Sequence, residues 1–448
     1  MNKRDFLKNS ASVVASSVLS RLSFAQKTGA SARTNWAGNY TYKAARLDEP
    51  ATAQEVQKLV TSVTHAKALG ARHSFNDIAD SPGDQVSLKH LDSMTLNKEA
   101  HTVTVGAGVT YGKLAPWLDA QGFAVHNLAS LPHVSVVGAC ATGTHGSGIH
   151  NGNLSTAVNA IEFVDGKGQM QTLSRADKTS GFQGVVVALG ALGVITRITL
   201  DVVPTFQISQ VVYEDLSFDQ LEHNLDAIFS SGYSVSLFTD WQKHRATQVW
   251  LKQNVSGSRA PHLSEMFYGA TLQKVKLHPL AGHSPENCTD QLGVPGPWFE
   301  RLPHFKMNFT PSSGAEVQSE FFVSRAQAYQ AILAVEQLKD RITPHLFVSE
   351  LRTIAADELW LSPAYQRDSM AIHFTWKPEM AAVLGVLPLI EQKLAPFNAR
   401  PHWAKVFTTS RQRLGELYPR LPDFRKLAAT YDPSGKFKNP YLQRAIEA

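Results

Sequence analysis

The sequence is poor in cysteine and has no long apolar run. Only Cys140 and Cys288 occur among its 448 residues, which excludes a disulfide framework and any C-x-x-C zinc or redox site. One cysteine lies in a glycine-rich loop and the other in a distant region, so we expect two free thiols. No run approaches the roughly 18 apolar residues of a membrane-spanning helix, and we therefore expect no stable membrane insertion.

The sequence also lacks the patterns of several function classes. Its formal charge is +5, but lysine and arginine form no block, which disfavours a nucleic-acid partner. Neither H-E-x-x-H nor G-x-S-x-G occurs, so a metal hydrolase and a serine hydrolase have little support, and no metal site is predicted. What is present is a globular composition, 43% hydrophobic and 18% charged, in a chain long enough for two or three domains.

The N-terminus has the layout of an export signal. Lys3-Arg4 precedes a Ser/Ala-rich stretch over residues 9–20, and the small-residue site Ser23-Phe24-Ala25 follows. This layout resembles a twin-arginine signal in which a lysine replaces the first arginine. Residues 1–26 are therefore predicted to be a signal read by the twin-arginine export machinery, for a periplasmic or otherwise exported protein. The alternative is an amphipathic N-terminus on a cytoplasmic protein.

Periodicity and turn residues predict a mixed α and β chain. Thr52-x-x-Glu55 is a capping box for a helix that ends near Gly70, and Asp165-Gly166 is a hairpin turn. The pattern predicts strands over residues 85–88, 103–105, 160–164, 169–173, 193–203, 234–238, 248–251, 346–354 and 370–376, and helices over 111–121, after Ser324 and over 378–394. We expect an α+β domain over residues 30–205, a second over 206–400, and a C-terminal segment, 401–448, that returns to the first.

Two glycine-rich loops, residues 69–75 and 138–146, are candidate phosphate sites. Small residues let backbone N–H groups approach an anion closely, and the hydroxyls of Ser74, Thr142 and Thr144 add donors. Two such loops in one domain suit a pyrophosphate, which has two anionic groups. The alternative is that both loops are ordinary tight turns.

Polar side chains alternate along two predicted strands. Glu350 and Arg352 share one face of the first strand, because strand side chains alternate with period 2. His373 and Thr375 share one face of the second strand, and Lys405 lies among apolar residues as a partly buried cation. Buried polar groups need partners, so these faces predict a cavity for a hydroxyl-rich ligand. The alternative is a structural Glu350–Arg352 ion pair with a solvent-facing His373.

Long collinear motifs resemble one enzyme family. They include His73-Ser74-Phe75-Asn76, Ala129-Ser130-Leu131-Pro132-His133, Ala141-Thr142-Gly143-Thr144-His145-Gly146-Ser147-Gly148, His373-Phe374-Thr375-Trp376 and Arg400-Pro401-His402-Trp403. Over residues 35–445 the chain is similar to the FAD-dependent oxidases of the vanillyl-alcohol oxidase superfamily, above all to its alditol oxidases. The resemblance implies an α+β fold in which residues 30–205 form a two-lobed FAD-binding domain and residues 206–400 form a cap domain that carries the substrate site.

The resemblance also implies which residues hold FAD. The family's covalent link to the flavin falls on His73, with Ser130 near the isoalloxazine and Ile195 near the adenine. The other cofactor positions that it implies are Gly70, Ala71, Arg72, Ser74, Ser135, Gly138, Thr142, Thr144, His145, Gly146 and His402. Arg72 is a departure, since many relatives have glycine there, and a Cβ restricts the backbone of this loop.

The same resemblance implies a substrate site and a reaction. The substrate positions are Ser130, Glu350, Arg352, Thr375 and Lys405, and the catalytic positions are His373, Lys405 and Arg352. We expect the terminal CH2OH of a polyol such as xylitol or sorbitol to be oxidised to the aldose, while molecular oxygen is reduced to hydrogen peroxide. Either His373 or Lys405 takes the hydroxyl proton or stabilises the alkoxide. Two alternatives stay open: an aldonolactone oxidase or dehydrogenase with another electron acceptor, and an exported sugar-binding protein.

Overall fold

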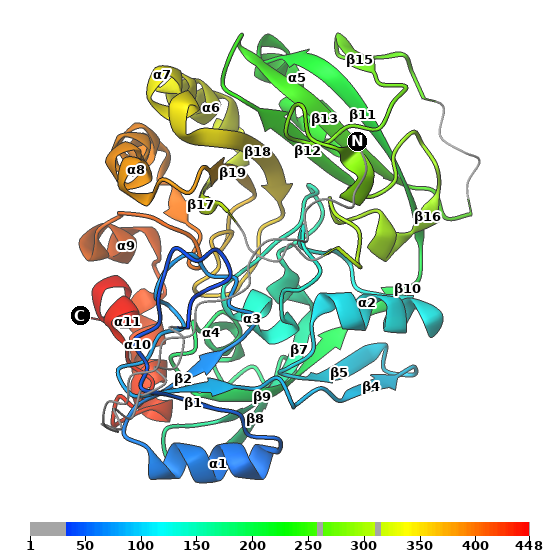
Figure 1. Cartoon of the computed structure of the whole chain (residues 1–448). Coiled ribbons are helices and arrows are strands. Elements are labelled where there is room, and N and C mark those ends of the chain that lie inside the picture. The colour runs from blue at the N-terminus through cyan, green and yellow to red at the C-terminus, as the bar shows by residue number, and fades with distance from the viewer. Residues whose placement is uncertain (1–32, 258–262, 310–314, 448) are drawn as a thin grey trace, which may run out of the picture. The chain divides into compact units, whose positions relative to one another are not determined.

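The computed structural model describes residues 33–257, 263–309 and 315–447. These residues belong to one compact unit, Arg33–Ala448, and the fold is α+β, as predicted. Figure 1 shows the smaller sheets of the first half of the chain below the large sheet of the second half. The export signal predicted for residues 1–26 lies outside the described residues, and the predicted domain boundaries stay predictions.

Two small sheets organise the first half of the chain. A parallel sheet has the order β1 (Arg46–Asp48), β3 (Asp84–Ser87), β2 (Ala66–Leu69). An antiparallel sheet has the order β4 (Met94–Asn97), β5 (Thr102–Gly106), β9 (Val194–Asp201), β7 (Val158–Val164), β8 (Met170–Ser174). The short strands β6 (Phe123–Ala124) and β10 (Val203–Pro204) form an antiparallel pair. The α-helices of this half are α1 (Ala53–Ser62), α2 (Tyr111–Ala120), α3 (Val136–Ala141) and α4 (Phe182–Val186).

A ten-stranded antiparallel sheet organises the second half. Its order is β14 (Met266–Phe267), β15 (Ala270–Leu272), β11 (Gln207–Ser217), β13 (Arg245–Asn254), β12 (Ser234–Thr239), β18 (Leu346–Ile354), β19 (Ser369–Trp376), β17 (Val317–Ser324), β20 (Arg400–Pro401), with β16 (Gly296–Pro297) paired to β11. Helices α5 (Asp219–Ser230), α6 (Ala328–Glu336), α7 (Lys339–Ile342) and α8 (Met380–Leu394) contribute to one core on this sheet. The side chains on its other face are therefore free to line a cavity.

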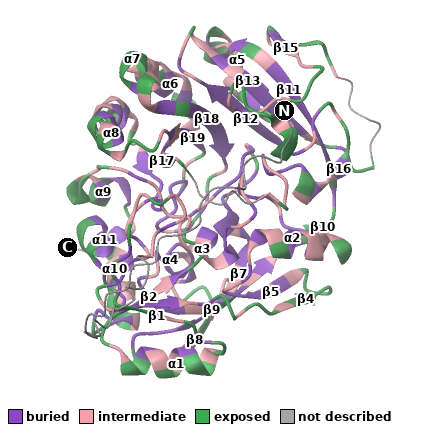
Figure 2. Ribbon diagram, viewed as in Figure 1, coloured by how far each residue is buried: buried purple, intermediate pink, exposed green. Residues whose placement is uncertain are grey.

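The C-terminal helices join the core of the first half. They are α9 (Arg411–Leu417), α10 (Leu421–Tyr431) and α11 (Pro440–Ala445), and Leu414, Phe424 and Tyr441 belong to the same buried cluster as Val103 of β5. Figure 2 shows that the central strands of both halves are largely buried, whereas the outer faces of the helices are exposed. The two cysteines are free thiols in different buried clusters, as predicted.

Helix α8 lies in an apolar stretch. Within the described residues, Met380–Phe397 is long and apolar enough by composition to cross a membrane, with a mean hydropathy of 1.3. Its Val383, Leu387 and Ile390 are fully buried against the large sheet. Core packing accounts for the apolar character of this face.

The structure differs from the sequence prediction around β2. The helix predicted to end near Gly70 ends at Ser62, although Thr52 caps it through a bond from the Glu55 N–H. Residues 66–69 instead pair with β3, and Lys67 is buried with its Nζ donating to the Leu189 and Gly190 carbonyls. Strand pairing and this satisfied lysine override the helical pattern.

Three further segments differ from the prediction. Strands β11 and β17 form where no strand is expected, and the Ser324 side chain makes no capping bond because this residue ends β17. The second glycine-rich segment begins inside α3 rather than in a loop. Small residues in this segment permit close helix packing as well as turns, so composition alone does not separate the two.

Candidate functional site

A cavity of about 340 Å³ is lined on one side by the glycine-rich segments and on the other by the free face of the large sheet. It brings together nearly all the predicted site residues, from segments far apart in the sequence. The predicted residues that line it are Gly70, Ala71, Arg72, His73, Ser74, Ser130, Ser135, Gly138, Thr142, Thr144, His145, Ile195, Glu350, Arg352, His373, Thr375, His402 and Lys405. Gly146 does not line it. A Cβ there would lie 2.2 Å from Asn127 Oδ1, so close packing requires this glycine.

The first wall of the cavity, which we call the backbone wall, consists of residues 70–74 and 135–144. Among the described residues, no partner is found for the N–H groups of the four residues from Ala71 to Ser74. A Cβ on Gly70 or Gly138 would lie 2.7 or 2.6 Å from Ser135 Oγ, so these segments approach each other closely. Successive free N–H groups on a cavity form a nest for an anion. The backbone wall therefore fits the pyrophosphate of FAD.

The hydroxyls of Thr142 and Thr144, which follow α3, are engaged within the protein. Thr142 Oγ1 donates to the Gly138 carbonyl at 3.1 Å and lies 3.3 Å from Thr144 Oγ1. Part of the cavity lining is apolar and consists of Leu88, Ala107, Val137 and Ile195. An apolar end next to an anion nest suits the flat adenine ring of the same cofactor.

Arg72 and His73 occupy the turn of the backbone wall. Arg72 has φ +62°, in the left-handed region that favours glycine. The arginine that replaces the family's glycine therefore has a backbone conformation that glycine adopts more readily. The His73 ring lies 4.5 Å from the Trp36 ring, and its Nδ1 is 3.1 Å from His133 Nε2. Burial, with smaller contributions from His133 and Lys405, lowers the pKa of His73, so its imidazole is neutral and keeps the nitrogen lone pair needed to bond to carbon.

The second wall, which we call the sheet wall, is a row of side chains across four adjacent strands, together with Arg352 and Lys405, which bond to this row. The register pairs Phe238 of β12 with Glu350 of β18, and Glu350 with His373 of β19. It also pairs His373 with Glu320 of β17. Directly opposed residues share a face of a sheet, and all four line the cavity. The row therefore places two buried carboxylates, Glu350 and Glu320, on either side of His373.

Glu320 is the buried carboxylate to which both cations of the sheet wall bind, and it is not among the site residues predicted from the sequence. It is 1% exposed, and it accepts hydrogen bonds from Lys405 Nζ at 2.8 Å and from Arg352 at 2.9 Å. Burial alone would raise its pKa, but Lys405, His145 and Arg352 hold that pKa well below its usual range. The recurrence of long polar side chains at every second position, Glu316, Gln318 and Glu320, is the signal that could have revealed this strand and its inward face.

Lys405 and His373 form a hydrogen-bonded pair. Lys405 Nζ lies 2.7 Å from His373 Nδ1, and His373 Nε2 lies 3.1 Å from Thr375 Oγ1. The Lys405 ammonium donates to Glu320, so His373 Nδ1 is an acceptor and Nε2–H donates to Thr375. Burial and Lys405 lower the pKa of His373 to about 4, so its imidazole is neutral near pH 7. His373 is 6% exposed, which excludes the solvent-facing alternative.

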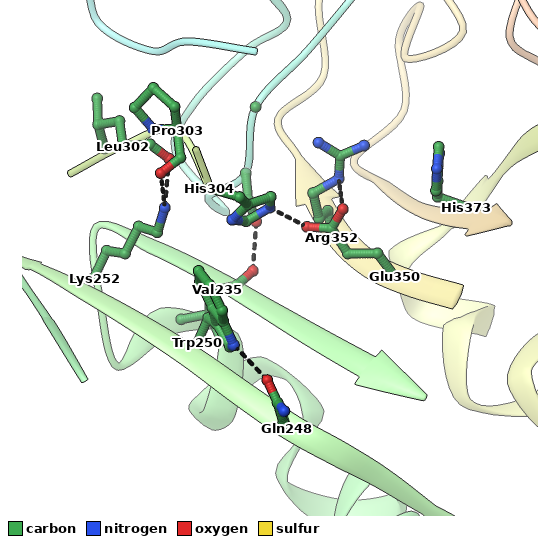
Figure 3. Close-up of polar contacts among 12 residues, drawn as sticks. Val235, Gln248, Trp250, Lys252, Leu302, Pro303, His304, Glu350, Arg352 and His373 are labelled. Carbon is green, nitrogen blue, oxygen red and sulfur yellow. Dashed lines mark hydrogen bonds and ion pairs between the residues drawn. The ribbon is translucent and has the colours of Figure 1, made fainter. Parts of the chain in front are cut away.

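Glu350 is held between His304 and Arg352 (Figure 3). Its Oε1 accepts a hydrogen bond from His304 Nε2 at 2.7 Å, and its Oε2 lies 3.5 Å from Arg352 Nε. Burial alone would raise the pKa of Glu350, but Arg352 and His304 hold that pKa below its usual range. The Glu350–Arg352 ion pair, which is the structural alternative to a ligand site, is therefore present, and both of its residues line the cavity. His304 has no sequence signal beyond its place after a Pro/Gly/His-rich loop.

Comparisons with known proteins agree with this geometry. The FAD binding domain family matches residues 44–174, and the D-arabinono-1,4-lactone oxidase family matches residues 314–445. The chain is 47% identical to the alditol oxidase of a Streptomyces species, over 92% of this chain and 99% of that protein. It is 27% identical to the L-gulonolactone oxidase of Scyliorhinus torazame, over 92% and 97% of the two chains.

Solved structures share the fold. A cholesterol oxidase from B. sterolicum superposes with a TM-score of 0.72 at 15% identity, covering 93% of this chain and 96% of that chain. A xylooligosaccharide oxidase from Myceliophthora thermophila superposes with a TM-score of 0.71 at 15% identity, covering 92% and 94%.

Proposed function

Since the chain belongs to the alditol oxidase family of the FAD-dependent vanillyl-alcohol oxidase superfamily, we propose that it oxidises the terminal alcohol of a polyol to the aldose. Xylitol and sorbitol are the proposed substrates, and molecular oxygen is the proposed electron acceptor, reduced to hydrogen peroxide. The observation that carries the proposal is the sheet wall. It places two carboxylates, Glu320 and Glu350, and two cations, Arg352 and Lys405, on one side of the cavity, and these acceptors and donors suit a chain of hydroxyls.

FAD, held by the backbone wall, supplies the hydride acceptor for this reaction. The protein's own residues bind and orient the polyol beside it. Glu350 accepts hydrogen bonds from substrate hydroxyls, and Arg352 and Lys405 donate to them. Ser130, on the cavity lining, adds a hydroxyl next to the backbone wall. Because the Glu350 and Arg352 side chains are buried, their hydrogen bonds form away from bulk water and gain strength.

The Lys405–His373 pair takes up the proton of the reacting hydroxyl. The Lys405 ammonium stabilises the developing alkoxide, and His373 Nδ1, 2.7 Å from Nζ, is ready to receive a proton from it. Lys405 then takes the proton of the hydroxyl, so the pair as a whole gains one proton. Glu320 acts by holding Lys405 in place.

A substrate panel tests the proposal against its two alternatives. Oxygen uptake and peroxide formation are measured with xylitol, sorbitol and L-gulono-1,4-lactone. A higher kcat/KM for the alditols is expected. A higher value for the lactone would favour an aldonolactone oxidase, and lactone oxidation with a dye but not with oxygen would favour a dehydrogenase. A colourless protein that binds polyols without turnover would favour a sugar-binding protein.

The covalent link at His73 is a further part of the proposal, supported by the neutral His73 imidazole on the backbone wall. Acid precipitation is expected to leave yellow flavin in the protein pellet, and His73→Ala to release it. Flavin in the supernatant of the wild-type protein would contradict the link.

Export is the last part of the proposal and is supported by the layout of residues 1–26. Fractionation of a bacterial host is expected to place the protein in the periplasm and Arg4→Lys to retain it in the cytoplasm. Equal cytoplasmic retention of both forms would contradict export.

A further inference from the structure

The sheet wall ends at Phe238, and a histidine from outside the sheet closes it there. The His304 ring packs edge-on against the Phe238 ring, with centroids 5.4 Å apart, and against the Trp250 ring at 5.3 Å. His304 and Phe238 both line the cavity. Figure 3 shows His304 beside Glu350, at the side of Glu350 away from His373.

A buried lysine anchors the segment that carries His304. Lys252 of β13 is fully buried, and its Nζ donates to the Leu302 carbonyl at 2.5 Å and to the Pro303 carbonyl at 3.0 Å. The Pro303 carbonyl also accepts from Thr289 Oγ1 at 2.8 Å. Burial lowers the pKa of Lys252 to about 7. Lys252 thus binds the carbonyls of the two residues that precede His304 in the chain. These bonds hold the segment in place and fix where the His304 ring lies (Figure 3).

The two ring nitrogens of His304 have different surroundings. Burial lowers its pKa, so the ring is neutral, and Nε2–H is the donor to Glu350 Oε1. Nδ1 is therefore an acceptor, and it is buried without a hydrogen-bond partner among the described residues. A buried acceptor without a donor costs free energy unless a ligand supplies the donor.

We propose that His304 is a further substrate-binding residue, which ends the polyol site and makes polyol length a property that the site selects. This inference rests on the proposed oxidation of alditols. The reacting end of the polyol lies at Lys405 and His373, because the segment that carries Lys405 is hydrogen-bonded to the chain that follows His73. Asn76 Nδ2 donates to the Lys405 carbonyl at 2.8 Å. The rest of the chain extends over Glu350 towards Phe238.

The dimensions of the sheet limit the length of that chain. His373 and Phe238 are two strands apart, which is roughly 10 Å at the usual spacing of neighbouring strands. His304 stands at the end of this span and cannot move aside easily, because Lys252 holds its segment. The distal hydroxyl of a polyol that fills the span supplies the donor that Nδ1 lacks.

Two substitutions separate the shape of His304 from its hydrogen bonds. His304→Ala removes both, whereas His304→Phe keeps the ring volume and removes only the nitrogens. The kcat/KM values are measured for glycerol, erythritol, xylitol, sorbitol and a seven-carbon alditol. Both variants are expected to lower kcat/KM for xylitol roughly 10- to 100-fold through KM, because Glu350 loses a charged hydrogen bond. Only His304→Ala is expected to raise the ratio of the seven-carbon alditol to xylitol, by about 10-fold.

Two controls keep the test decisive. His223→Ala, at a side chain that is 81% exposed, is expected to change neither value. Lys252→Met, which does not touch the cavity lining, is expected to shift the length ratio in the direction of His304→Ala by a smaller factor. Flavin absorbance per protein shows in each case that the holoenzyme has formed.

The outcomes also separate this inference from the proposed function. A wild-type protein that oxidises no alditol would overturn both. A wild-type protein that oxidises alditols, with a length profile unchanged in folded, flavin-bearing His304→Ala, would overturn the role of His304 alone. A loss of kcat without any change in KM or length profile would likewise overturn it.

Discussion

The backbone wall and the sheet wall face the same cavity but bind in different ways. The backbone wall presents the free N–H groups of residues 71–74, and the hydroxyl of Thr142 is used within the protein. The sheet wall presents side chains, and its Glu320, Arg352 and Lys405 hold one another in place. Apart from the His73 side chain, a substitution in the first wall changes a ligand contact only when it moves the backbone, whereas one in the second removes the contact itself.

This difference fits the two ligands. A pyrophosphate is the same in every protein that binds FAD, so a generic nest of N–H groups serves it. A polyol has to be held by hydroxyl positions, which requires donors and acceptors at defined places along its chain. The expected effects of substitution follow from this contrast, and they are given below from the largest to the smallest.

The largest effect is expected at Lys405. Lys405→Met removes the ammonium next to the reacting hydroxyl, and kcat is expected to fall by about 10²- to 10⁴-fold. Flavin content is expected to be unchanged, because Lys405 belongs to the sheet wall. Steady-state kinetics and the flavin absorbance of the same sample check both statements. Lys426→Met, at a side chain that is 83% exposed, is the control, and equal losses in the two variants would contradict the assignment.

A smaller loss is expected from Glu320→Gln. Gln keeps the shape of the side chain but leaves the Arg352 and Lys405 charges without their buried carboxylate. Removing one member of a buried ion cluster is expected to lower the free energy of unfolding by about 3 kcal/mol, together with kcat/KM. Thermal unfolding and kinetics measure the two effects. Glu316→Gln, at a partly exposed residue just before β17, is expected to change little, and an equal loss there would contradict the central place of Glu320.

The pH profile is expected to show an acid limb. His373 has its pKa lowered to about 4 and must be unprotonated to receive a proton, so activity is present above that pH and lost below it. We expect kcat/KM to fall about tenfold per pH unit below the pKa. His373→Asn is expected to be slower and to lose this limb. An unchanged limb in that variant, with the fold intact by circular dichroism, would assign the titration to another group.

The smallest effect is expected in the backbone wall. Thr142→Val removes a hydroxyl that donates to the Gly138 carbonyl, so the free energy of unfolding is expected to fall by about 1 kcal/mol. Flavin content and kcat/KM are expected to stay within about twofold of the wild type, since the N–H groups remain. Loss of flavin from a folded Thr142→Val protein would show that this side chain binds the cofactor directly and would weaken the contrast between the walls.

The site residues that the sequence predicts are those whose position depends on local patterns. The glycine-rich segments and the pairs Glu350/Arg352 and His373/Thr375 were recognisable because loop composition and period 2 are local properties. Glu320 was not found, although its strand alternates, because the register that places it opposite His373 joins segments about fifty residues apart. His304 was not found because its place depends on Lys252, whose burial no local pattern indicates.

The fold shows the same limit. The helix before Gly70 was predicted too long, since pairing with β3 decides the structure of residues 66–69. The central strands of the large sheet, β18 and β19, are predicted correctly because each is rich in apolar residues and carries two polar residues spaced two apart, Glu350/Arg352 and His373/Thr375. Local patterns thus indicated which segments form strands, and only the tertiary structure showed which strands lie side by side.

The central claim is that the sheet wall binds the substrate while the backbone wall binds the cofactor. It is tested most directly by mixing xylitol with Glu350→Gln without oxygen and following the flavin absorbance. We predict a flavin content equal to that of the wild type and bleaching that is at least about tenfold slower at the same xylitol concentration. Bleaching at the wild-type rate, or a folded protein that has lost its flavin, would contradict the account.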